Sequence, residues 1–503
     1  MRQNLAFPDG VAVLSGDLEP SRQRSLAGGP RRQAFYGDES IITPANVANL
    51  GVRWTHAAGG AITGSPVVAD VEVPGEGVIR VVYFLAWDRN VYAVRFIDGS
   101  LLWKTPTDEQ PNATFPTATT VDVADVDGRD VVFVGSGEVF YALEAATGTE
   151  DWRFTVGTGC GTLGVGGSFP GFCNRFIGDE RNEIEGSAFV ANGTVFVTMD
   201  VNDKAVGKGG MYGLDARDGR MRWFFDLESG MTCRPDPTDV IRQYDPYHGE
   251  AALNLPAGFL TKPGCDHPRN RNGCGNIWSS PAVDFEREAI YLASSNCDTD
   301  FDAGTGEPEP PMPPYDEAIF ALSFDGDPVW VWRPREIDNA DLAFGGAPNL
   351  FEINFGGAMR QVVGVGNKDG SYYVLDRDGT NQVTGLVEPY WQTKVVPGGD
   401  IGGILATASV DEGDRRIYFS TAAGDGVVND PGRKPAQQPT LHALDMDSGA
   451  ILWQNDAANG FPPPQLASFG PTSASPGLVY FNQVPLAVLR IHDAATGAEL
   501  KRV

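Results

Sequence analysis

The chain has 503 residues, 42% of them hydrophobic, so it can bury a large core as two or three ordinary domains or as one ring of repeats. Its formal net charge of −28 produces a surface that repels phosphate groups, which argues against a nucleic-acid partner. No apolar run is long enough for a transmembrane helix, so no membrane span is predicted.

The first 40 residues are predicted to form an N-terminal arm, and residues 41–503 a single domain. Residues 1–30 lack the apolar segment that a secretory signal requires. Six cysteines nevertheless favour disulfides and an oxidising compartment. We therefore expect a periplasmic or secreted protein whose signal is not part of this sequence; reduced cysteines are the alternative.

A short motif recurs along the chain with a fixed spacing between a glycine and a tryptophan. Residues 142–152 read ALEAATGTEDW, with a turn that closes at Gly148 and Trp152 four residues later. The same spacing recurs at 213–223 and at 443–453, and looser copies occur elsewhere. The tryptophans, with a lysine in the last copy, stand at positions 54, 103, 152, 223, 330, 391, 453 and 501. The first two steps of 49 residues give the length of one repeat.

Each copy follows β-branched and aromatic segments, such as VVFVGSGEVFYAL and GTVFVTMD, that are separated by Gly and Asp turns. One repeat is therefore predicted to be an antiparallel sheet of about four strands. Such sheets bury both faces when they stack around an axis, so the predicted fold is an all-β propeller. The tryptophan is expected to wedge between neighbouring blades, and the glycine to supply a positive φ at the turn.

Two irregular insertions are predicted in the long interval between the tryptophans at 223 and 330. The first, at 231–275, is rich in Cys, Pro and Asn, and the second, at 298–314, is acidic and rich in Pro. Long irregular loops on a rigid scaffold are usually functional, so these insertions are expected to cover a ligand.

The cysteines allow two interpretations. Cys160 and Cys173 flank a glycine-rich loop and are one candidate disulfide pair, and a bridge from Cys297 to Cys274 is another. Zinc bound around Cys265 and its neighbours Cys233, His267 and Cys274 is the alternative. Disulfides are preferred, but their connectivity stays open.

The Gly–Trp motif resembles the tryptophan-docking repeat of the pyrroloquinoline-quinone (PQQ) dependent alcohol dehydrogenases along nearly the whole chain. Residues 42–54, ITPANVANLGVRW, look like the N-terminal strand of that family. The resemblance implies an eight-bladed propeller, of which seven full repeats and this strand are visible. Members similar to polyvinyl-alcohol dehydrogenase match best, on WSSPAVD and the cysteine-rich insertion. Because two residues follow Lys501, either the sequence is clipped at both ends or the ring closes with seven blades.

The segment 275–296, GNIWSSPAVDFEREAIYLASSN, carries the more specific part of the resemblance. In the family, a tryptophan in this blade lies under the quinone, and an asparagine 18 residues later ligates calcium. Trp278 and Asn296 match these places. A flat indole can stack on a flat quinone, and an amide oxygen is a hard ligand suited to calcium. The alternative is that Trp278 is an ordinary core residue.

The next segment, IDNADLAFGG at 337–346, resembles the family's active-site stretch, in which an aspartate accepts the alcohol proton. Asp341 is the predicted base and a predicted metal ligand, and Asp338 is the alternative base and a predicted cofactor contact. Ala343 stands where lanthanide-using relatives carry an aspartate, which favours calcium. Lys368, in GNKDGSYYVL, takes the place of the Arg or Lys that contacts the quinone oxygens. Each of these residues has the alternative of a solvated loop side chain.

The third predicted metal ligand is less well matched. Family members carry a glutamate after the strand that corresponds to TVFVTM, where this chain has Asp203, with Asp200 as a second choice. A shorter acid requires the loop or the ion to shift. Elsewhere, the DVADVDGRD segment at 122–130 looks like a calcium loop, but an Asp/Gly turn between strands is the preferred interpretation.

The resemblance implies a PQQ- and calcium-dependent enzyme that oxidises an alcohol, possible substrates including secondary or polymeric alcohols. No CxxCH haem motif occurs, so electrons are expected to pass to a separate acceptor such as a soluble cytochrome c. Asp341 would take the hydroxyl proton, and Lys368 would add positive charge where oxyanion character develops. The alternatives are a non-catalytic propeller of the same repeat type, acting as a scaffold or binding module, and a degraded enzyme.

Overall fold

The computed structural model describes most of the chain, and a short strand pair, β1 (Leu5–Ala6) and β2 (Ala12–Val13), precedes the main body. The other described residues are 24–108, 118–156, 160–163, 172–173, 183–200, 209–227, 230–234, 277–295, 315–336, 338, 341–399, 402–422, 440–455, 470–483 and 488–503. Most of both predicted insertions, at 231–275 and 298–314, lies outside these residues.

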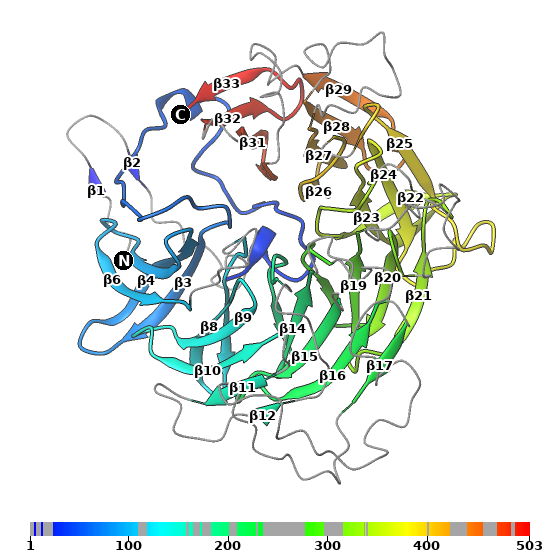
Figure 1. The fold of residues 1–503 in the computed structure, drawn as a ribbon. Coiled ribbons are helices and arrows are strands. Elements are labelled where there is room, and N and C mark those ends of the chain that lie inside the picture. Colours follow the sequence, from blue (N-terminus) through cyan, green and yellow to red (C-terminus); the bar gives the residue numbers. More distant parts are fainter. Residues whose placement is uncertain are drawn as a thin grey trace, which may run out of the picture.

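Seven antiparallel sheets follow one another around a ring, and in each sheet every strand pairs with the next strand of the sequence (Figure 1). The first sheet comprises β3 (Val67–Val73), β4 (Gly77–Ala86), β5 (Asn90–Arg95) and β6 (Leu101–Pro106). The second comprises β7 (Asp122–Val126), β8 (Arg129–Ser136), β9 (Val139–Glu144), β10 (Glu150–Thr155), β11 (Cys160–Leu163) and β12 (Phe172–Cys173). The third comprises β13 (Phe189–Ala191), β14 (Thr194–Met199), β15 (Gly210–Asp215), β16 (Met221–Asp226) and β17 (Met231–Cys233).

The remaining four sheets have four strands each. The fourth comprises β18 (Ala282–Asp284), β19 (Ala289–Ala293), β20 (Ile319–Ser323) and β21 (Pro328–Trp332). The fifth comprises β22 (Asn349–Phe355), β23 (Ala358–Gly366), β24 (Ser371–Asp376) and β25 (Trp391–Lys394). The sixth comprises β26 (Ser409–Asp411), β27 (Arg416–Ser420), β28 (Leu441–Asp445) and β29 (Ile451–Asn455). The seventh comprises β30 (Thr472–Ser475), β31 (Leu478–Gln483), β32 (Val488–Asp493) and β33 (Glu499–Arg502).

The second and third strands of the sheets are buried on both faces over much of their length, and this explains why their sequences contain continuous apolar runs. Strand β14, for example, reads TVFVTM and all six of its residues are buried. The hydrophobic clusters cross the sheet boundaries, since one cluster joins residues of β8–β10 to residues of β14–β16. Stacking of successive sheets therefore forms the core, as the repeat pattern predicted.

The repeated tryptophan docks each sheet onto the next. Trp152, which is 1% exposed, lies against Gly219 of the third sheet and donates its indole N–H to the carbonyl of Ala216 over 3.1 Å. A Cβ atom on any of the seven turn glycines would lie within 2.6 Å of the docked ring, and all seven have a φ of +71° to +80°. The prediction of a wedge and a positive-φ turn is therefore confirmed. The seven glycines are Gly99, Gly148, Gly219, Gly326, Gly379, Gly449 and Gly497.

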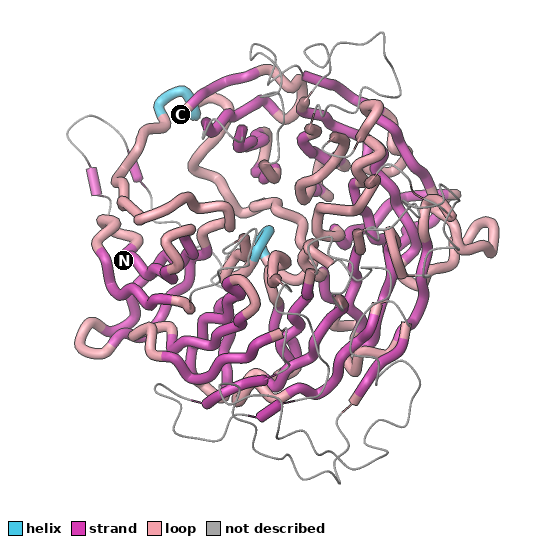
Figure 2. The backbone as a smooth tube through the Cα atoms, viewed as in Figure 1, coloured by secondary structure: helices cyan, strands magenta, loops and turns pink. Residues whose placement is uncertain are grey.

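Part of the N-terminal arm crosses the centre of the ring as an irregular segment that contains the 3-10 turn η2 (Leu26–Gly28) (Figures 1 and 2). Its carbonyl groups accept hydrogen bonds of 2.8–2.9 Å from the innermost strands of five sheets. The bonds are Val123 to Arg24, Val283 to Pro30, Leu350 to Arg31, Val410 to Gln33 and Ala474 to Ala34. The arm thus pairs the backbone edges that the inner strands would otherwise present to the axis.

A segment without strands lies between the seventh and first sheets (Figure 1). Val47, in the 3-10 turn η3 (Val47–Asn49), packs against Leu478 and Ile491 of the seventh sheet. Further along, Trp54 lies against Gly99 of the first sheet and donates to the carbonyl of Phe96 over 2.9 Å. The predicted strand at 42–54 is therefore wrong, although its tryptophan docks as the motif requires.

The described residues contain the seven repeats that the sequence predicted, and the one further sheet among them is the two-stranded β1–β2 pair, which is not a blade. The division of the chain into an N-terminal arm at 1–40 and a single domain at 41–503 stays a prediction. No helix in the described part of the chain is long and apolar enough to cross a membrane.

Candidate functional site

The candidate site lies where the connections into the fourth, fifth and sixth sheets meet. Trp278 precedes β18 and is half-buried against Leu405, in the segment that leads into β26. Gly345, in the segment before β22, lies so close that a Cβ atom there would stand 2.2 Å from the indole ring. The indole is therefore fixed in place by backbone and apolar contacts from two other repeats.

Lys368 and Asp341 form an ion pair beside this tryptophan. The Lys368 Nζ lies 2.8 Å from Asp341 Oδ1 and 5.9 Å from the centroid of the Trp278 ring. The lysine side chain is 11% exposed and the aspartate side chain 42% exposed, so the carboxylate is the more accessible partner. The structure therefore brings together three of the predicted site residues from three different loops.

Backbone contacts hold the loop of Lys368. Its N–H donates to the carbonyl of Ala343 over 3.1 Å, and its carbonyl accepts from Gly399 over 3.0 Å. A Cβ atom on Gly403 would lie 2.1 Å from that carbonyl, which shows how closely the segment before β26 approaches. Lys368 thus sits on a main chain that is fixed from both sides, and this restricts the positions that its ammonium group can reach.

Asp341 occupies a turn that Asp338 supports. Asp341 has a φ of +50°, which is unusual for a residue other than glycine and is found at functional turns. The carboxylate of Asp338, which is buried, accepts the N–H of Leu342 over 2.5 Å. Asp338 therefore stabilises the turn that presents Asp341, while its predicted cofactor contact stays a prediction.

The predicted metal site is only partly described. Asn296 and Asp203 lie outside the described residues, as do Cys265, His267, Cys274 and Cys297. Asp200, the second choice, is buried at the end of its sheet, where its backbone pairs with Glu183. Among the described residues, no group of three His, Cys, Asp or Glu side chains is placed to hold a metal ion.

Sequence reasoning missed Arg335, which follows β21. Its guanidinium forms ion pairs with the buried Glu317 and, over 2.6 Å, with Asp369. It also donates to the carbonyl of Leu342 over 3.3 Å and to Asn367 Oδ1 over 3.4 Å. Burial and the neighbouring Asp369 carboxylate raise the pKa of Tyr373, whose hydroxyl donates to Asp369. The available signal was an arginine at the end of a strand, six residues before the predicted base.

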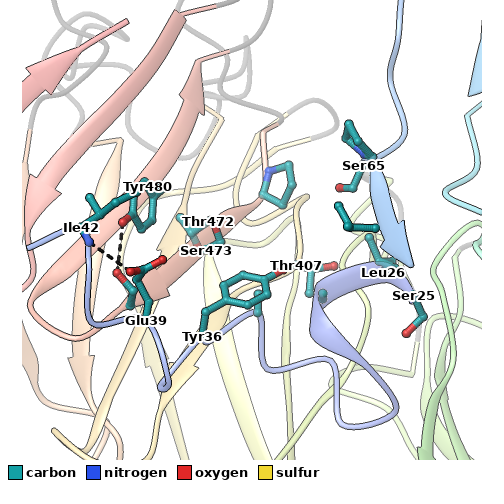
Figure 3. Close-up of a pocket in the computed structure, with 16 residues that line it drawn as sticks. Ser25, Leu26, Tyr36, Glu39, Ile42, Ser65, Thr407, Thr472, Ser473 and Tyr480 are labelled. Carbon is teal, nitrogen blue, oxygen red and sulfur yellow. Dashed lines mark hydrogen bonds between the residues drawn. The ribbon is translucent and has the colours of Figure 1, made fainter. Parts of the chain in front are cut away.

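A cavity of about 430 Å³ lies elsewhere, between the arm and the first, sixth and seventh sheets (Figure 3). Hydroxyl groups of Tyr36, Thr407 and Tyr480 are among its lining, and Glu39 contributes a carboxylate. The Glu39 carboxylate accepts the N–H groups of Ile41 and Ile42 over 2.6 and 3.0 Å. Trp278, Asp341 and Lys368 do not line this cavity.

The other motifs are placed as follows. Cys160 and Cys173 face each other in the register of β11 and β12, at the Cα separation that an antiparallel ladder sets. Cys233 is buried at the end of β17. Asp125 and Asp127 lie at the β7–β8 hairpin, where Asp125 accepts the N–H of Gly128 over 3.1 Å, so the predicted turn is confirmed.

Comparison with known proteins decides the family. The model of the glucose/ethanol/alcohol dehydrogenase β-propeller domain, named PQQ, matches residues 26–402. The chain belongs to this family. The match covers the arm segment at the axis, the first five sheets and all described residues of the candidate site up to Gly399.

Curated relatives are distant and longer than this chain. A polyvinylalcohol dehydrogenase of a Pseudomonas species is 22% identical over 462 residues, which are 87% of this chain and 60% of that protein. The quinohemoprotein alcohol dehydrogenase ADH-IIG of Pseudomonas putida is 24% identical over 376 residues, 73% of this chain and 46% of that protein. The chain therefore spans about half to three fifths of the length of these relatives.

Solved structures share the fold. The quinohemoprotein alcohol dehydrogenase of Comamonas testosteroni superposes with a TM-score of 0.62 at 17% identity, covering 96% of this chain and 73% of that chain. A europium-containing methanol dehydrogenase superposes with a TM-score of 0.67 at 16% identity, covering 96% and 85%. The recognition of a quinoprotein fold from the Gly–Trp repeat is thereby confirmed.

Proposed function

We propose that this protein is a PQQ-dependent dehydrogenase that oxidises an alcohol to an aldehyde or ketone. The observation that carries the proposal is the Asp341–Lys368 ion pair beside the face of Trp278, in a family whose name refers to PQQ. The three groups are an aromatic face, a cation and an accessible carboxylate. A scaffold protein has no evident need for this combination at one place.

The residues present fit the quinone. PQQ is a flat, anionic tricycle, and an indole face with an ammonium group beside it complements both its shape and its charge. Trp278 would lie against the ring plane, and Lys368 would contact its oxygen atoms. The bound quinone supplies the acceptor for the two electrons of the alcohol.

Asp341 is the group that we assign to the alcohol proton. Its carboxylate is the more exposed member of the ion pair, and the ammonium group 2.8 Å away stabilises its ionised form. An ionised, accessible carboxylate can accept a hydroxyl proton in the transition state. Asp338 holds the turn and is the alternative base, but its carboxylate already accepts the N–H of Leu342.

The predicted calcium site is only partly described, because Asn296 and Asp203 lie outside the described residues. We therefore assign no step to a metal ion. Asn296, Asp203 and Asp341 remain the calcium ligands to be tested, by metal analysis of the protein after refolding with calcium.

The remaining assignments are also proposals. Relatives include polyvinylalcohol dehydrogenases and a lupanine 17-hydroxylase named for cytochrome c, so a secondary or polymeric alcohol and a soluble cytochrome are the substrate and acceptor to try first. We propose a periplasmic or secreted location. The Cα atoms of Cys160 and Cys173 lie opposite each other at a ladder separation that suits a disulfide.

The test is reconstitution of the purified protein with PQQ and calcium, followed by dye reduction with primary, secondary and polymeric alcohols. We expect reduction that depends on both the alcohol and PQQ. Asp341→Asn should lower kcat by about 10³-fold, since a general base typically contributes about 10²–10⁴-fold. Asp218→Asn is the matched control, because Asp218 is similarly exposed, at 37%, and lies in the third sheet away from the site.

Each outcome decides a separate question. If a well-folded sample does not bind PQQ at all, the proposed function is wrong and the non-catalytic binding propeller replaces it. If PQQ binds and Asp341→Asn retains full activity, the base has been assigned to the wrong residue. Binding without turnover in the native protein would favour a degraded enzyme.

A further inference from the structure

Arg335 is the charged residue that connects the two loops of the candidate site. It donates to the carbonyl of Leu342, next to Asp341, and to the side chain of Asn367, next to Lys368. Asn367 is buried and itself donates to the carbonyl of Leu342 over 2.7 Å. Arg335 and Asn367 therefore tie the loop of Asp341 to the loop of Lys368 at one shared carbonyl.

Arg335 also neutralises two acids, one of which directly follows Lys368 in the sequence. Its guanidinium pairs with Glu317, whose side chain is fully buried, and with Asp369, whose side chain is 13% exposed. Asp369 is the residue directly after Lys368, so without Arg335 an uncompensated carboxylate would remain in the same loop as the lysine ammonium. A buried acid that loses its cation attracts any other cation within reach, because the low dielectric of the interior strengthens the interaction.

The side chain of Asp369 is oriented by further contacts. Its two oxygens accept the N–H of Ser371 over 2.7 Å and the hydroxyl of Tyr373 over 2.5 Å. Asp369 forms its ion pair with Arg335, while Lys368 pairs with Asp341. The arrangement separates two ion pairs that lie side by side in the fold.

We propose that Arg335 is a positioning residue for Lys368. By holding Glu317 and Asp369, it leaves Asp341 as the carboxylate that pairs with the lysine, and it fixes the distance between the two loops. The proposal concerns this chain's own residues, and it rests on the proposed function only for its consequence in turnover.

The first test needs neither PQQ nor an alcohol. The rate at which an acylating reagent modifies Lys368 is measured in the protein by mass spectrometry of its tryptic peptide. In Arg335→Gln, the released Asp369 carboxylate should hold the Lys368 ammonium. The rate of modification should then fall by about fivefold to tenfold, where tenfold corresponds to a free-energy difference of RT ln 10. Arg335→Gln combined with Asp369→Asn should restore the rate, because the competing carboxylate is gone.

A merely structural role predicts a different pattern. Loss of packing would loosen the loop, raise the rate of modification in Arg335→Gln and raise it further in the double variant; either increase overturns the proposal. Arg217→Gln is the matched control, because Arg217 pairs with Asp127 on an exposed surface and should leave the rate unchanged. Far-ultraviolet circular dichroism of each variant verifies that the sheets have formed.

The second test uses the reconstituted protein. Arg335→Lys keeps the charge but cannot make all four contacts, so PQQ affinity should stay within about twofold while kcat falls by about tenfold and the KM for the alcohol changes little. Native kcat in Arg335→Lys would overturn the proposal. Failure of the proposed function would abolish turnover in every variant and in the native protein, yet it would leave the pattern of lysine modification intact.

Discussion

Two junctions between neighbouring sheets are packed differently. One lies between the fourth and fifth sheets, and the other between the seventh and first sheets. At the former, Trp330 lies against Gly379 and donates to the carbonyl of Arg377 over 2.8 Å, as the repeat prescribes. At the latter, Lys501 takes the tryptophan position and donates to the carbonyl of Ala48 over 2.9 Å, in a segment without strands. The tryptophan of one repeat therefore stabilises a junction only where the next sheet provides the glycine turn on which the ring docks.

The arm connects these two regions, because its backbone pairs with the inner strands of both sides of the ring. The most buried side chain in the described part of the arm is Arg32, which is 0% exposed and donates to the carbonyls of Pro281 and Leu26 over 2.8 Å each and to that of Ala188 over 3.4 Å. Burial lowers the pKa of Arg32 to about 10, against the attraction of Asp122. Arg32 thus ties the arm to the segments that lead into the third and fourth sheets.

The largest effect is expected from Arg32→Gln. The change removes a buried cation, leaves three backbone carbonyls short of a donor and takes away the main countercharge of Asp122, so the free energy of unfolding should fall by about 4 kcal/mol. Urea denaturation followed by tryptophan fluorescence measures it. Arg31→Gln is the control, since Arg31 belongs to the same arm but its side chain is 40% exposed, and it should cost about 1 kcal/mol or less. Equal costs for the two variants would mean that the axial cation has no special role.

Trp330→Ala should have the next largest effect. It empties the space over Gly379 between the fourth and fifth sheets and should cost about 3 kcal/mol, at the lower end for tryptophan because the ring is only half-buried. The variant also tests the site, because this junction lies between Trp278 and Lys368. We expect a lower melting temperature in calorimetry together with weaker PQQ binding. A stability loss with unchanged PQQ affinity would separate the docking motif from the site.

The sequence predicted the seven repeats because the Gly–Trp spacing is a local signal, set by the turn and the ring that docks on it. It did not predict the arm's path, because residues 24–36 have no periodicity and pair through carbonyl groups that any residue possesses. For the candidate site, motif positions predicted Trp278, Asp341 and Lys368, which the structure brings close together. Arg335 was not, because its role depends on three partners that are distant in sequence: Glu317, Asn367 and Asp369.

The buried Asp122, which lies near Arg32 at the axis, should make the free energy of unfolding depend on pH. Burial raises the pKa of Asp122 to about 7, above the value of about 3.9 in an unfolded chain. The folded state therefore retains a proton that the unfolded state loses, and this group lowers stability as the pH rises from about 4 to 7. Relative to the native protein, Asp122→Asn should gain about 2 kcal/mol of stability between pH 5 and pH 7. Denaturant unfolding at both pH values measures it, and parallel pH profiles of the two proteins would contradict it.

The smallest effect is expected at the junction without a repeat partner. Lys501→Ala removes one exposed contact to the carbonyl of Ala48 and should change the free energy of unfolding by less than about 0.5 kcal/mol. Trp54 instead carries this junction, since it docks on Gly99 like the repeat tryptophans. Trp54→Ala, measured beside Lys501→Ala by the same thermal melt, should be clearly more destabilising. If the two changes lower the free energy of unfolding equally, the apolar contacts of Val47 hold the segment between the seventh and first sheets. Tryptophan docking would then stabilise only the junctions between the seven repeats.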